Sequence, residues 1–403
     1  MRLSYDPGVE AFRSELARWL DAMAPDPAEM EADPPLSSAH APAWARAWQA
    51  RLFEAGWLVP GWPPELGGRH ASPLEQAVYL EELARRGLPR TTNPQGLGIV
   101  APSIVEHGTP EQRRRWALPL LRGELTACLG MSEPGAGSDL AGLATRAELG
   151  GDGFVVSGQK LWTSGAHHAD FCLCFVRTDP EARRHQGISV LIVPMDLPGV
   201  STRPLPHLAG EEYPDFNEVF LDQVEVPGHH LVGPLNGGWQ VARSSLGHER
   251  HMMWISAAAT IDDALARLLE EARRPAAASL ADQLASLFID AQALRLLGQR
   301  ALAKLARNMV SPEQSLLKLH ASETSRRLHL LGSEVAGPRG VEPPEGAARP
   351  KAGIWAARSG LPWATRYLAS FGNTIAGGTS EIQRNIVAEQ VLGLPRQAPA
   401  PSR

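Results

Sequence analysis

The sequence predicts a multidomain α+β protein in which a helical region precedes a β region and a second helical region follows. The chain has 403 residues, of which 43% are hydrophobic and 21% charged, so it is long enough to form more than one core. Apolar residues recur at helical spacing towards both ends of the chain, whereas its middle contains short runs rich in Val, Ile and Phe. We therefore expect a helical domain at 1–125, a β domain at 126–235, a helical bundle at 236–398 and a disordered tail at 399–403.

The first two regions are predicted from their apolar periodicity and from the residues that end each run. Segments such as "GVEAFRSELARWLDAM" and "SPLEQAVYLEELARRG" have helical spacing and are separated by Pro and Gly in "VPGWPPELGG". The runs typical of strands are "GFVVSG", "DFCLCFVRTD", "GISVLIVPMD" and "FNEVFLDQVEVPG". Each of these runs ends at Gly, Pro or Asp, so we expect separate strands of one sheet domain.

The third region returns to helical spacing after "NGGW". Its long segments are "WISAAATIDDALARLLEEA", "ADQLASLFIDAQALRLLGQRALAKLA" and "EQSLLKLHASETSRRLHLLG". Long amphipathic helices of this kind predict an antiparallel bundle. The segment at 336–353, "AGPRGVEPPEGAARPKAG", should interrupt the bundle as a surface loop.

The charge and cysteine content argue against several classes of partner. A net charge of −5 gives no electrostatic reason to bind nucleic acid or an anionic membrane. The sequence shows no leader and no apolar run of membrane length, and Cys128, Cys172 and Cys174 lack metal-ligand spacing. We therefore expect a cytoplasmic protein that binds neither nucleic acid nor membrane.

Two stretches of the β region carry residue types that suit a polar ligand. In "CLGMSEPGAGSDLAG", Gly135 and Gly137 lie between Ser132 and Ser138, so backbone N–H groups and hydroxyls can approach a ligand closely. A simple tight turn explains the same pattern equally well. In "GQKLWTSGAHHADF", Trp162 adjoins two small hydroxyl residues, although a core tryptophan is the more common explanation of such a residue. Together the two stretches suit a planar heterocycle with polar edges.

Glu249, in "SSLGHERHMMWISAA", is a carboxylate among apolar residues at helical spacing. Its neighbours on a helix face would be Leu246, Met252, Met253 and Ser256. A carboxylate in such surroundings loses hydration, so it is costly unless it is paired or used in catalysis. An ordinary ion pair with Arg243 or Arg250 is the structural alternative.

The adjacent histidines His167 and His168 are the remaining candidates for metal ligation. Their rings would diverge in either a strand or a turn, so we assign them a structural or supporting role and expect no metal site.

Six motifs occur in an order that is typical of one family of flavoenzymes. They are "WPPELGG", "SEPGAGSDL", "GQKLWTSGAHHAD", "FNEVFLDQVEVPG", "NGGWQVA" and "IAGGTSEIQRNIVAEQVLGLPR". By these motifs the chain resembles the acyl-CoA dehydrogenases, and the resemblance runs from roughly residue 5 to 395. The resemblance implies an N-terminal α-helical domain, a central β-barrel or sheet domain and a C-terminal four-helix bundle. It also implies α,β-dehydrogenation of an acyl-CoA thioester with FAD as cofactor.

The resemblance assigns cofactor and substrate contacts to specific positions. Ser132 and Ser164 are expected to donate hydrogen bonds to the isoalloxazine, against which Trp162 packs. The full set expected at the flavin is Leu129, Met131, Ser132, Gly137, Ser138, Trp162, Thr163, Ser164, Thr379, Ser380 and Glu381. The set expected at the thioester is Ser138, Arg250, Gly377 and Gly378.

The catalytic base is assigned by a second comparison with the family. Many members carry it as a glutamate immediately before "GTS", where this chain has Gly377. A subset that resembles the isovaleryl-CoA and long-chain dehydrogenases has glycine there and takes its base from a Glu-Arg pair on a bundle helix. Glu249 in "LGHERHMMW" matches that placement, so we expect it to abstract the α proton while the β hydride passes to flavin N5. Glu381 matches a flavin contact and is a poor candidate for the base.

One departure from the family pattern concerns the FAD diphosphate. Members usually carry an Arg before the second bundle helix that reaches it across a subunit interface, whereas this chain reads "RRPAAASLADQLAS" at 273–286. Arg273 or Arg274 could replace it, or a sister subunit could supply an Arg. A homodimer, a homotetramer or a heterotetramer with a homologous partner is therefore expected.

The resemblance further implies an electron-transfer flavoprotein as electron acceptor. A flavin monooxygenase on the same scaffold is the remaining alternative, although such proteins need no base at Glu249.

Overall fold

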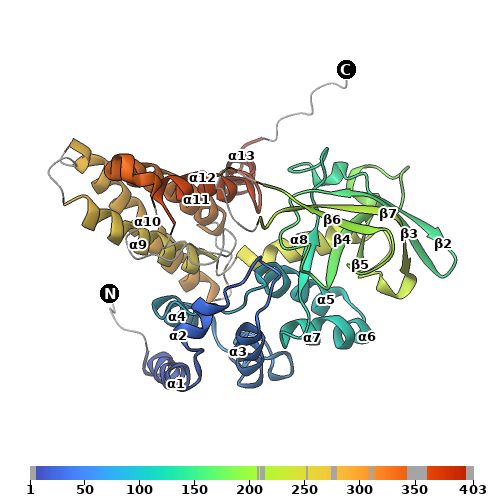
Figure 1. The fold of residues 1–403 in the computed structure, drawn as a ribbon, viewed down its shortest axis with the longest axis horizontal. Coiled ribbons are helices and arrows are strands. Elements are labelled where there is room, and N and C mark those ends of the chain that lie inside the picture. Colours follow the sequence, from blue (N-terminus) through green and yellow to red (C-terminus); the bar gives the residue numbers. More distant parts are fainter. Residues whose placement is uncertain are drawn as a thin grey trace. The chain divides into compact units, whose positions relative to one another are not determined.

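The computed structural model describes two compact units (Figure 1), the first of which reaches Glu249 while the second begins at Arg250. The described residues are 6–206, 208, 214–250, 253–273, 279–307, 309, 313–342 and 361–395, with the backbone alone described at 245–250, 253 and 313–315. No helix within these ranges has the length and hydrophobicity needed to cross a bilayer.

Helices form the first part of the first unit, as the periodicity predicts. They are α1 (Pro7–Met23), α2 (Pro27–Ala32), α3 (Ala43–Glu54), α4 (Pro73–Arg85), α5 (Ala101–His107), α6 (Pro110–Gln112) and α7 (Leu118–Leu121). Helix α4 begins where it does because Ser72 and Glu75 form a reciprocal capping box with Pro73 at the first helical position. Trp48, Trp57 and many aliphatic side chains then join these helices into one buried core.

A seven-stranded sheet follows in the same unit. Its strands are β1 (Ala127–Gly130), β2 (Arg146–Gly150), β3 (Gly153–Lys160), β4 (Phe171–Arg177), β5 (Ile188–Pro194), β6 (Val200–Pro204) and β7 (Asn217–Pro227). The strand order is β1-β4-β2-β3-β7-β6, and β5 pairs with β4. Strands β4 and β5 are buried on both faces, which explains why their sequences are continuous apolar runs rather than alternating ones. The strands expected in this part of the chain are present.

Helices return with α8 (Gly238–Arg250) and continue through the second unit. The long helices there are α9 (Met253–Glu271), α10 (Ala281–Leu305), α11 (Glu313–Ala336) and α12 (Trp363–Ile375), and α11 packs against the other three. Two glycines let tryptophans pack directly on helix backbones, because an added Cβ at Gly298 or Gly332 would lie 2.2 Å from the ring of Trp254 or Trp363. The four-helix bundle implied by the family resemblance is therefore present.

The predicted loop and tail are described only in part. Helix α11 continues to Ala336 and a 3-10 helix covers Gly337–Val341, so the first residues of the expected loop are helical. The rest of that loop beyond residue 342 and the tail at 399–403 lie outside the described residues.

Candidate functional site

The two glycine- and serine-bearing stretches of the β region lie side by side in the first unit. Strand β1 ends at Gly130 and β3 ends at Lys160, and the chain leaves both strands at neighbouring points. The Leu161 N–H donates to the Ser132 carbonyl oxygen at 2.8 Å. Because Leu161 immediately precedes Trp162, this bond brings the predicted serine and tryptophan contacts of the flavin together.

The loop after β1 turns sharply and leaves open space around its glycines. Glu133 and Ala136 exchange backbone hydrogen bonds of 2.8 and 3.1 Å, so the tight turn considered from the sequence does form. An added Cβ at Gly135 or Gly137 would meet no atom within 4 Å. These glycines therefore do not serve packing against the protein, and their backbone remains open to approach by a ligand.

Trp162 is held in an unusual backbone conformation with its ring exposed. Its φ is +60°, and 56% of the residue is accessible to solvent. The ring touches Phe216 edge to face, with centroids 5.8 Å apart, and the core-tryptophan alternative is wrong. On its C-terminal side, Thr163 and Asn217 exchange backbone hydrogen bonds of 3.0 and 3.1 Å, which fix the segment against the start of β7. The indole is therefore a large apolar surface presented by a firmly held backbone.

Hydroxyls beside this indole have no hydrogen-bond partner among the described residues. Ser132 and Ser164 are half-buried, and neither side chain bonds to a described residue. The Thr163 Oγ1 is buried without a partner as well. A buried hydroxyl without a partner is costly, so the Thr163 hydroxyl is available to bond a ligand with polar edges. An exposed indole, donor hydroxyls and open glycines together fit an isoalloxazine.

A buried ion pair beneath this loop was missed by the sequence reasoning. The Lys160 Nζ lies 2.7 Å from the Glu133 Oε1, and the two side chains are 0% and 6% exposed. Burial alone would raise the pKa of the Glu133 carboxyl, but the Lys160 ammonium and N–H donors outweigh it and lower the pKa. Lys160 shares its face of β3 with the buried Phe154 and Val156. A lysine in phase with core residues of a strand was the signal that could have found the pair.

The histidines after Trp162 belong to a cluster with a third histidine from the helical region. The ring of His168 lies 4.2 Å from that of His167 and 5.0 Å from that of His40, between ring centroids. Burial, reinforced by the two neighbouring imidazoles, lowers the pKa of His168 to about 4. Within the described residues, no group of three or more His, Cys, Asp or Glu is arranged to hold a metal ion.

The second unit contains the segment Gly377–Glu381 at the start of α13 (Ser380–Ile386). Thr379 caps this helix, because its Oγ1 accepts a hydrogen bond from the Ile382 N–H at 3.2 Å. The Ser380 hydroxyl donates to the Glu323 Oε1 on α11 at 2.7 Å. Glu381 is 77% exposed at its side chain and pairs with Arg384 on the same helix. Thr379 and Ser380 are the two hydroxyl residues of this segment that were expected at the flavin. Of these, Ser380 already donates to a protein acceptor.

The two glycines before this helix have left-handed backbones. The φ angles of Gly377 and Gly378 are +66° and +95°, which disfavours any residue with a side chain. The Lys318 Nζ donates to the Gly378 carbonyl oxygen at 2.6 Å. Burial, only partly opposed by Glu323 and Glu381, lowers the pKa of Lys318. The backbone at 377–378 is thus fixed, and a glutamate at 377 would be strained.

Three family models match the chain in sequence order. They are the acyl-CoA dehydrogenase N-terminal domain at residues 7–124, the middle domain at 128–224 and the C-terminal domain at 236–392. The chain is also 38% identical to the acyl-CoA dehydrogenase IpdE1 of Mycobacterium tuberculosis, over 97% of this chain and 99% of that protein. The chain belongs to the acyl-CoA dehydrogenase family. As a member, it is an enzyme and a flavoprotein.

Solved structures of acyl-CoA dehydrogenases share the fold of this chain. The ChsE4-ChsE5 complex from Mycobacterium tuberculosis aligns with a TM-score of 0.79 and 34% identity, covering 98% of this chain and 100% of that one. A steroid ACAD described as Tcur3481-Tcur3483 aligns with a TM-score of 0.78 and 30% identity, with coverage of 98% and 100%. These matches agree with the helical, sheet and bundle architecture.

Glu249, the base expected on a bundle helix, lies in α8, whose residues up to Glu249 belong to the first unit and not to the bundle formed by α9–α12. Backbone of α8 includes Glu249 and Arg250, whereas the side chains of both lie outside the described residues, as do residues 251–252. Arg273, one candidate for the diphosphate, is 75% exposed and pairs with Glu270 at 3.1 Å, and Arg274 lies outside the described residues. The assignments of Glu249 and Arg250 therefore stay predictions.

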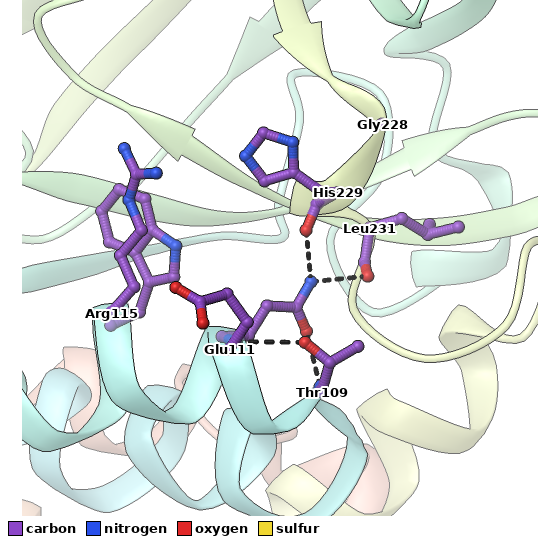
Figure 2. A pocket seen from close by; sticks show the side chains of 8 residues that line it. Thr109, Glu111, Arg115, Gly228, His229 and Leu231 are labelled. Atoms are coloured by element: carbon purple, nitrogen blue, oxygen red, sulfur yellow. Dashed lines mark hydrogen bonds between the residues drawn. The ribbon is translucent and has the colours of Figure 1, made fainter.

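Two hollows in the first unit do not include the predicted flavin contacts. One, of 210 Å³, lies between α6 and the end of β7 (Figure 2), and the other, of 760 Å³, adjoins it through Arg115, Trp116 and His229. In the smaller hollow the Gln112 amide donates to the carbonyl oxygens of His229 and Leu231 at 2.7 and 2.9 Å. Both of these bonds are to protein acceptors, so the Gln112 amide is not free for a ligand.

Proposed function

We propose that the chain removes the α and β hydrogens of an acyl-CoA thioester, with FAD as cofactor and Glu249 as the base. The observation that carries the proposal is a pattern of two residues: the chain has glycine at 377, where many family members carry the base, and glutamate at 249. A residue with φ of +66° at 377 is a poor place for a catalytic glutamate, so the base must come from elsewhere. Glu249 is the carboxylate that the family resemblance places on a bundle helix, and α8 includes it.

The first unit would hold the polar edge and one face of the isoalloxazine. The Ser132 and Ser164 hydroxyls have no described partner and would donate to it, while the exposed indole of Trp162 would cover its ring. The remaining contacts we propose on this unit are Leu129, Met131, Gly137, Ser138 and Thr163, and those on the second unit are Thr379, Ser380 and Glu381. When bound, the flavin supplies the hydride acceptor.

The thioester would be oriented by residues of both the loop and the bundle. Ser138 is exposed on the loop after β1, and Gly377 is exposed with no atom within 4 Å of an added Cβ, whereas the Gly378 carbonyl oxygen already accepts a hydrogen bond from Lys318. We propose that these residues and Arg250 position the thioester, so that the Glu249 carboxylate can remove the α proton. Exclusion of water by flavin and acyl chain would raise the pKa of that carboxyl towards the range useful for a base.

Anaerobic titration with a panel of acyl-CoA thioesters tests the reaction. A productive substrate is expected to bleach the oxidised flavin in the wild type, and Glu249→Gln should slow bleaching by roughly 10²–10⁴-fold while the flavin stays bound. Glu54→Gln removes an exposed glutamate of α3 that has no proposed role at the flavin or the thioester, and it serves as the matched control. Undiminished bleaching in Glu249→Gln would reject the base, and oxygen-dependent product without thioester oxidation would favour a monooxygenase.

We also infer that the chain works as an oligomer, with a homologous chain as a second candidate partner. Two similar structures are described by paired names, ChsE4-ChsE5 and Tcur3481-Tcur3483. On α10, Phe288, Ile289 and Leu296 are 49%, 65% and 64% exposed, which suits burial against another subunit. The segment 279–286 brings no basic residue to the FAD diphosphate, so a partner arginine would complete the site.

Measurement of mass and flavin content tests the choice of partner. A chain that forms a heteromer should purify alone with less than one FAD per chain and gain flavin when a homologous family member is added. Full FAD occupancy in a homodimer or homotetramer would reject the need for a second gene product.

The substrate and the electron acceptor are proposed from the comparisons and from the family resemblance. A similar structure is described as a steroid ACAD, which supports a bulky, steroid-derived acyl-CoA as one member of the test panel. An electron-transfer flavoprotein is the proposed acceptor, by resemblance to the family. Turnover with that acceptor but not with oxygen is the expected result.

A further inference from the structure

The buried pair of Glu133 and Lys160 lies next to both proposed flavin segments. Glu133 directly follows Ser132, and Lys160 is two residues before Trp162. Leu161 lies between Lys160 and Trp162 in sequence, and its N–H donates to the Ser132 carbonyl oxygen at 2.8 Å. A displacement of either charged residue would therefore move a hydroxyl or an indole that faces the proposed ligand.

The pair joins four separate segments of the first unit. Lys160 at the end of β3 donates to the carboxylate of Glu133 and, at 2.6 Å, to the Phe175 carbonyl oxygen of β4. The carboxylate also accepts the N–H groups of Ala144 at 2.6 Å and Thr145 at 3.0 Å, just before β2. Three donors thus fix the carboxylate, and the loop that carries it cannot rotate without breaking them.

Two glycines leave room for this arrangement. A Cβ at Gly130 would lie 2.8 Å from the Cys172 Sγ and 3.4 Å from the Lys160 Cγ, so the lysine stem passes directly over the end of β1. A Cβ at Gly158 would lie 2.6 Å from the Thr145 Oγ1, and β3 has a register shift beside it. The backbone is therefore shaped around the pair.

Stability alone explains such a pair poorly. A buried ion pair must offset the loss of hydration of both charges, and apolar residues of the same volume commonly serve the fold as well or better. The pair occurs where two ligand-facing segments leave the sheet, which is where fixed orientation matters.

We propose that Glu133 and Lys160 are positioning residues, which set the spacing of Ser132 and Trp162–Ser164 before the flavin binds. The proposal rests on the flavin site of the proposed function. Neither side chain would touch the flavin, because both are buried within the sheet. Their effect would pass through the backbone of Ser132 and Leu161, and it would reduce the ordering that flavin binding otherwise requires.

The test compares variants that keep or remove the charges. Glu133→Gln with Lys160→Met removes both charges at nearly constant volume, so that no buried charge is left without a partner. Glu133→Asp keeps the charge and retracts it by one methylene. Glu82→Gln is the control, because Glu82 is also a buried carboxylate with cationic partners but lies in the helical region. It pairs with Arg13 of α1, Arg85 of α4 and Arg86, which follows α4.

The measured quantities are the dissociation constant of FAD, the visible absorption bands of bound flavin and the thermal midpoint of the apoprotein. The double variant is expected to keep its thermal midpoint but to bind FAD roughly tenfold more weakly, with shifted bands, as is usual when supporting residues behind a ligand shell are lost. Glu133→Asp should show a smaller change of the same kind. Glu82→Gln should change the thermal midpoint alone.

Unchanged FAD affinity and bands in both the double variant and Glu133→Asp would overturn the proposal. If the double variant does not fold, Glu133→Asp decides the question by itself. A wild type that binds no FAD, alone or with a homologous partner, would instead overturn the proposed function.

Discussion

The pair Lys160–Glu133 beside Ser132 and Trp162 is buried, whereas the cations around the segment Gly377–Glu381 reach solvent. Lys318, which donates to the Gly378 carbonyl oxygen, is half-buried, and Arg384 is exposed. The Lys160 side chain is 0% exposed. The Arg384 side chain is 55% exposed and lies 3.5 Å from Glu323 and 3.4 Å from Glu381. Exposed pairs are screened and contribute little, while a buried pair fixes geometry and is costly to break. The comparison indicates that the loop around Ser132 and Trp162 is preorganised more strongly than the segment Gly377–Glu381.

The largest expected effect comes from breaking the buried pair on one side. Lys160→Met leaves the Glu133 carboxylate buried without its cation, and we predict a loss of about 3–5 kcal/mol in the free energy of unfolding. Urea denaturation measures it. Arg114→Met, which breaks an ion pair of the first unit in which the Arg114 and Glu111 side chains are both 65% exposed, is the control and should cost less than about 1 kcal/mol. If both variants lost the same free energy of unfolding, the claim that buried ion pairs hold the fold more strongly than exposed ones would be wrong.

Acid should destabilise the first unit through a buried histidine. His230 is 3% exposed and donates from Nδ1 to the Ile192 carbonyl oxygen, and burial, together with the nearby His229 and Arg115, lowers its pKa to about 4. Between its ordinary pKa of 6.5 and about 4, the unfolded chain therefore binds a proton that the folded chain does not. The contribution of neutral His230 to the free energy of unfolding is complete above this window. It falls as the pH drops through the window, by about 3 kcal/mol between pH 7 and pH 4.

Replacement of the histidine checks this pH dependence. In His230→Asn the fall in unfolding free energy between pH 7 and pH 4 should become shallower. His185→Asn, at an exposed position, should leave the slope as it is in the wild type. An unchanged slope in His230→Asn would show that other groups cause the acid sensitivity.

A smaller effect is expected at the cap of α13. Thr379→Ala removes the hydroxyl that accepts the Ile382 N–H, and we predict a loss of about 1 kcal/mol in helix stability. Hydrogen exchange of the first-turn amides of α13 should accelerate while the amides of β3 stay protected. Thr379→Ser retains the cap and should behave as the wild type. No change in exchange for Thr379→Ala would show that the cap does not order this segment.

The smallest effect is expected from the exposed arginine of the bundle. Arg384→Gln breaks pairs with Glu323 and Glu381, and the cost should be about 0.2–1 kcal/mol. Because screening weakens exposed pairs, the difference from the wild type should shrink in high salt. A loss as large as that of Lys160→Met would reverse the comparison between the loop around Ser132 and Trp162 and the segment Gly377–Glu381.

The order of domains was readable because apolar periodicity is a local property. The continuous runs at β4 and β5 and the long amphipathic stretches at α9, α10 and α11 each specify their own element. The family resemblance added the four-helix arrangement, which periodicity alone does not fix. The start of the predicted loop at 336 differs, because helical residues continue there into a 3-10 turn at Gly337–Val341.

The site was harder to predict because its contacts join distant parts of the chain. Glu133 and Lys160 are 27 residues apart, and His40 meets His168 across the helical and sheet regions. The exposure of Trp162 follows from a backbone φ of +60°, which its residue type does not indicate. The phase of Lys160 on β3 was visible in the sequence, but its partner required the strand pairing.

Proton abstraction by Glu249 is tested most directly by hydrogen exchange at the α carbon of an acyl-CoA whose β carbon carries no hydrogen. Such a thioester can lose its α proton but cannot be oxidised, so deuterium uptake from D₂O reports the base alone. Wild-type enzyme with bound flavin is expected to catalyse the exchange, and Glu249→Gln with the same flavin content should do so roughly 10²–10⁴-fold more slowly. Equal exchange rates in the two proteins would contradict the account.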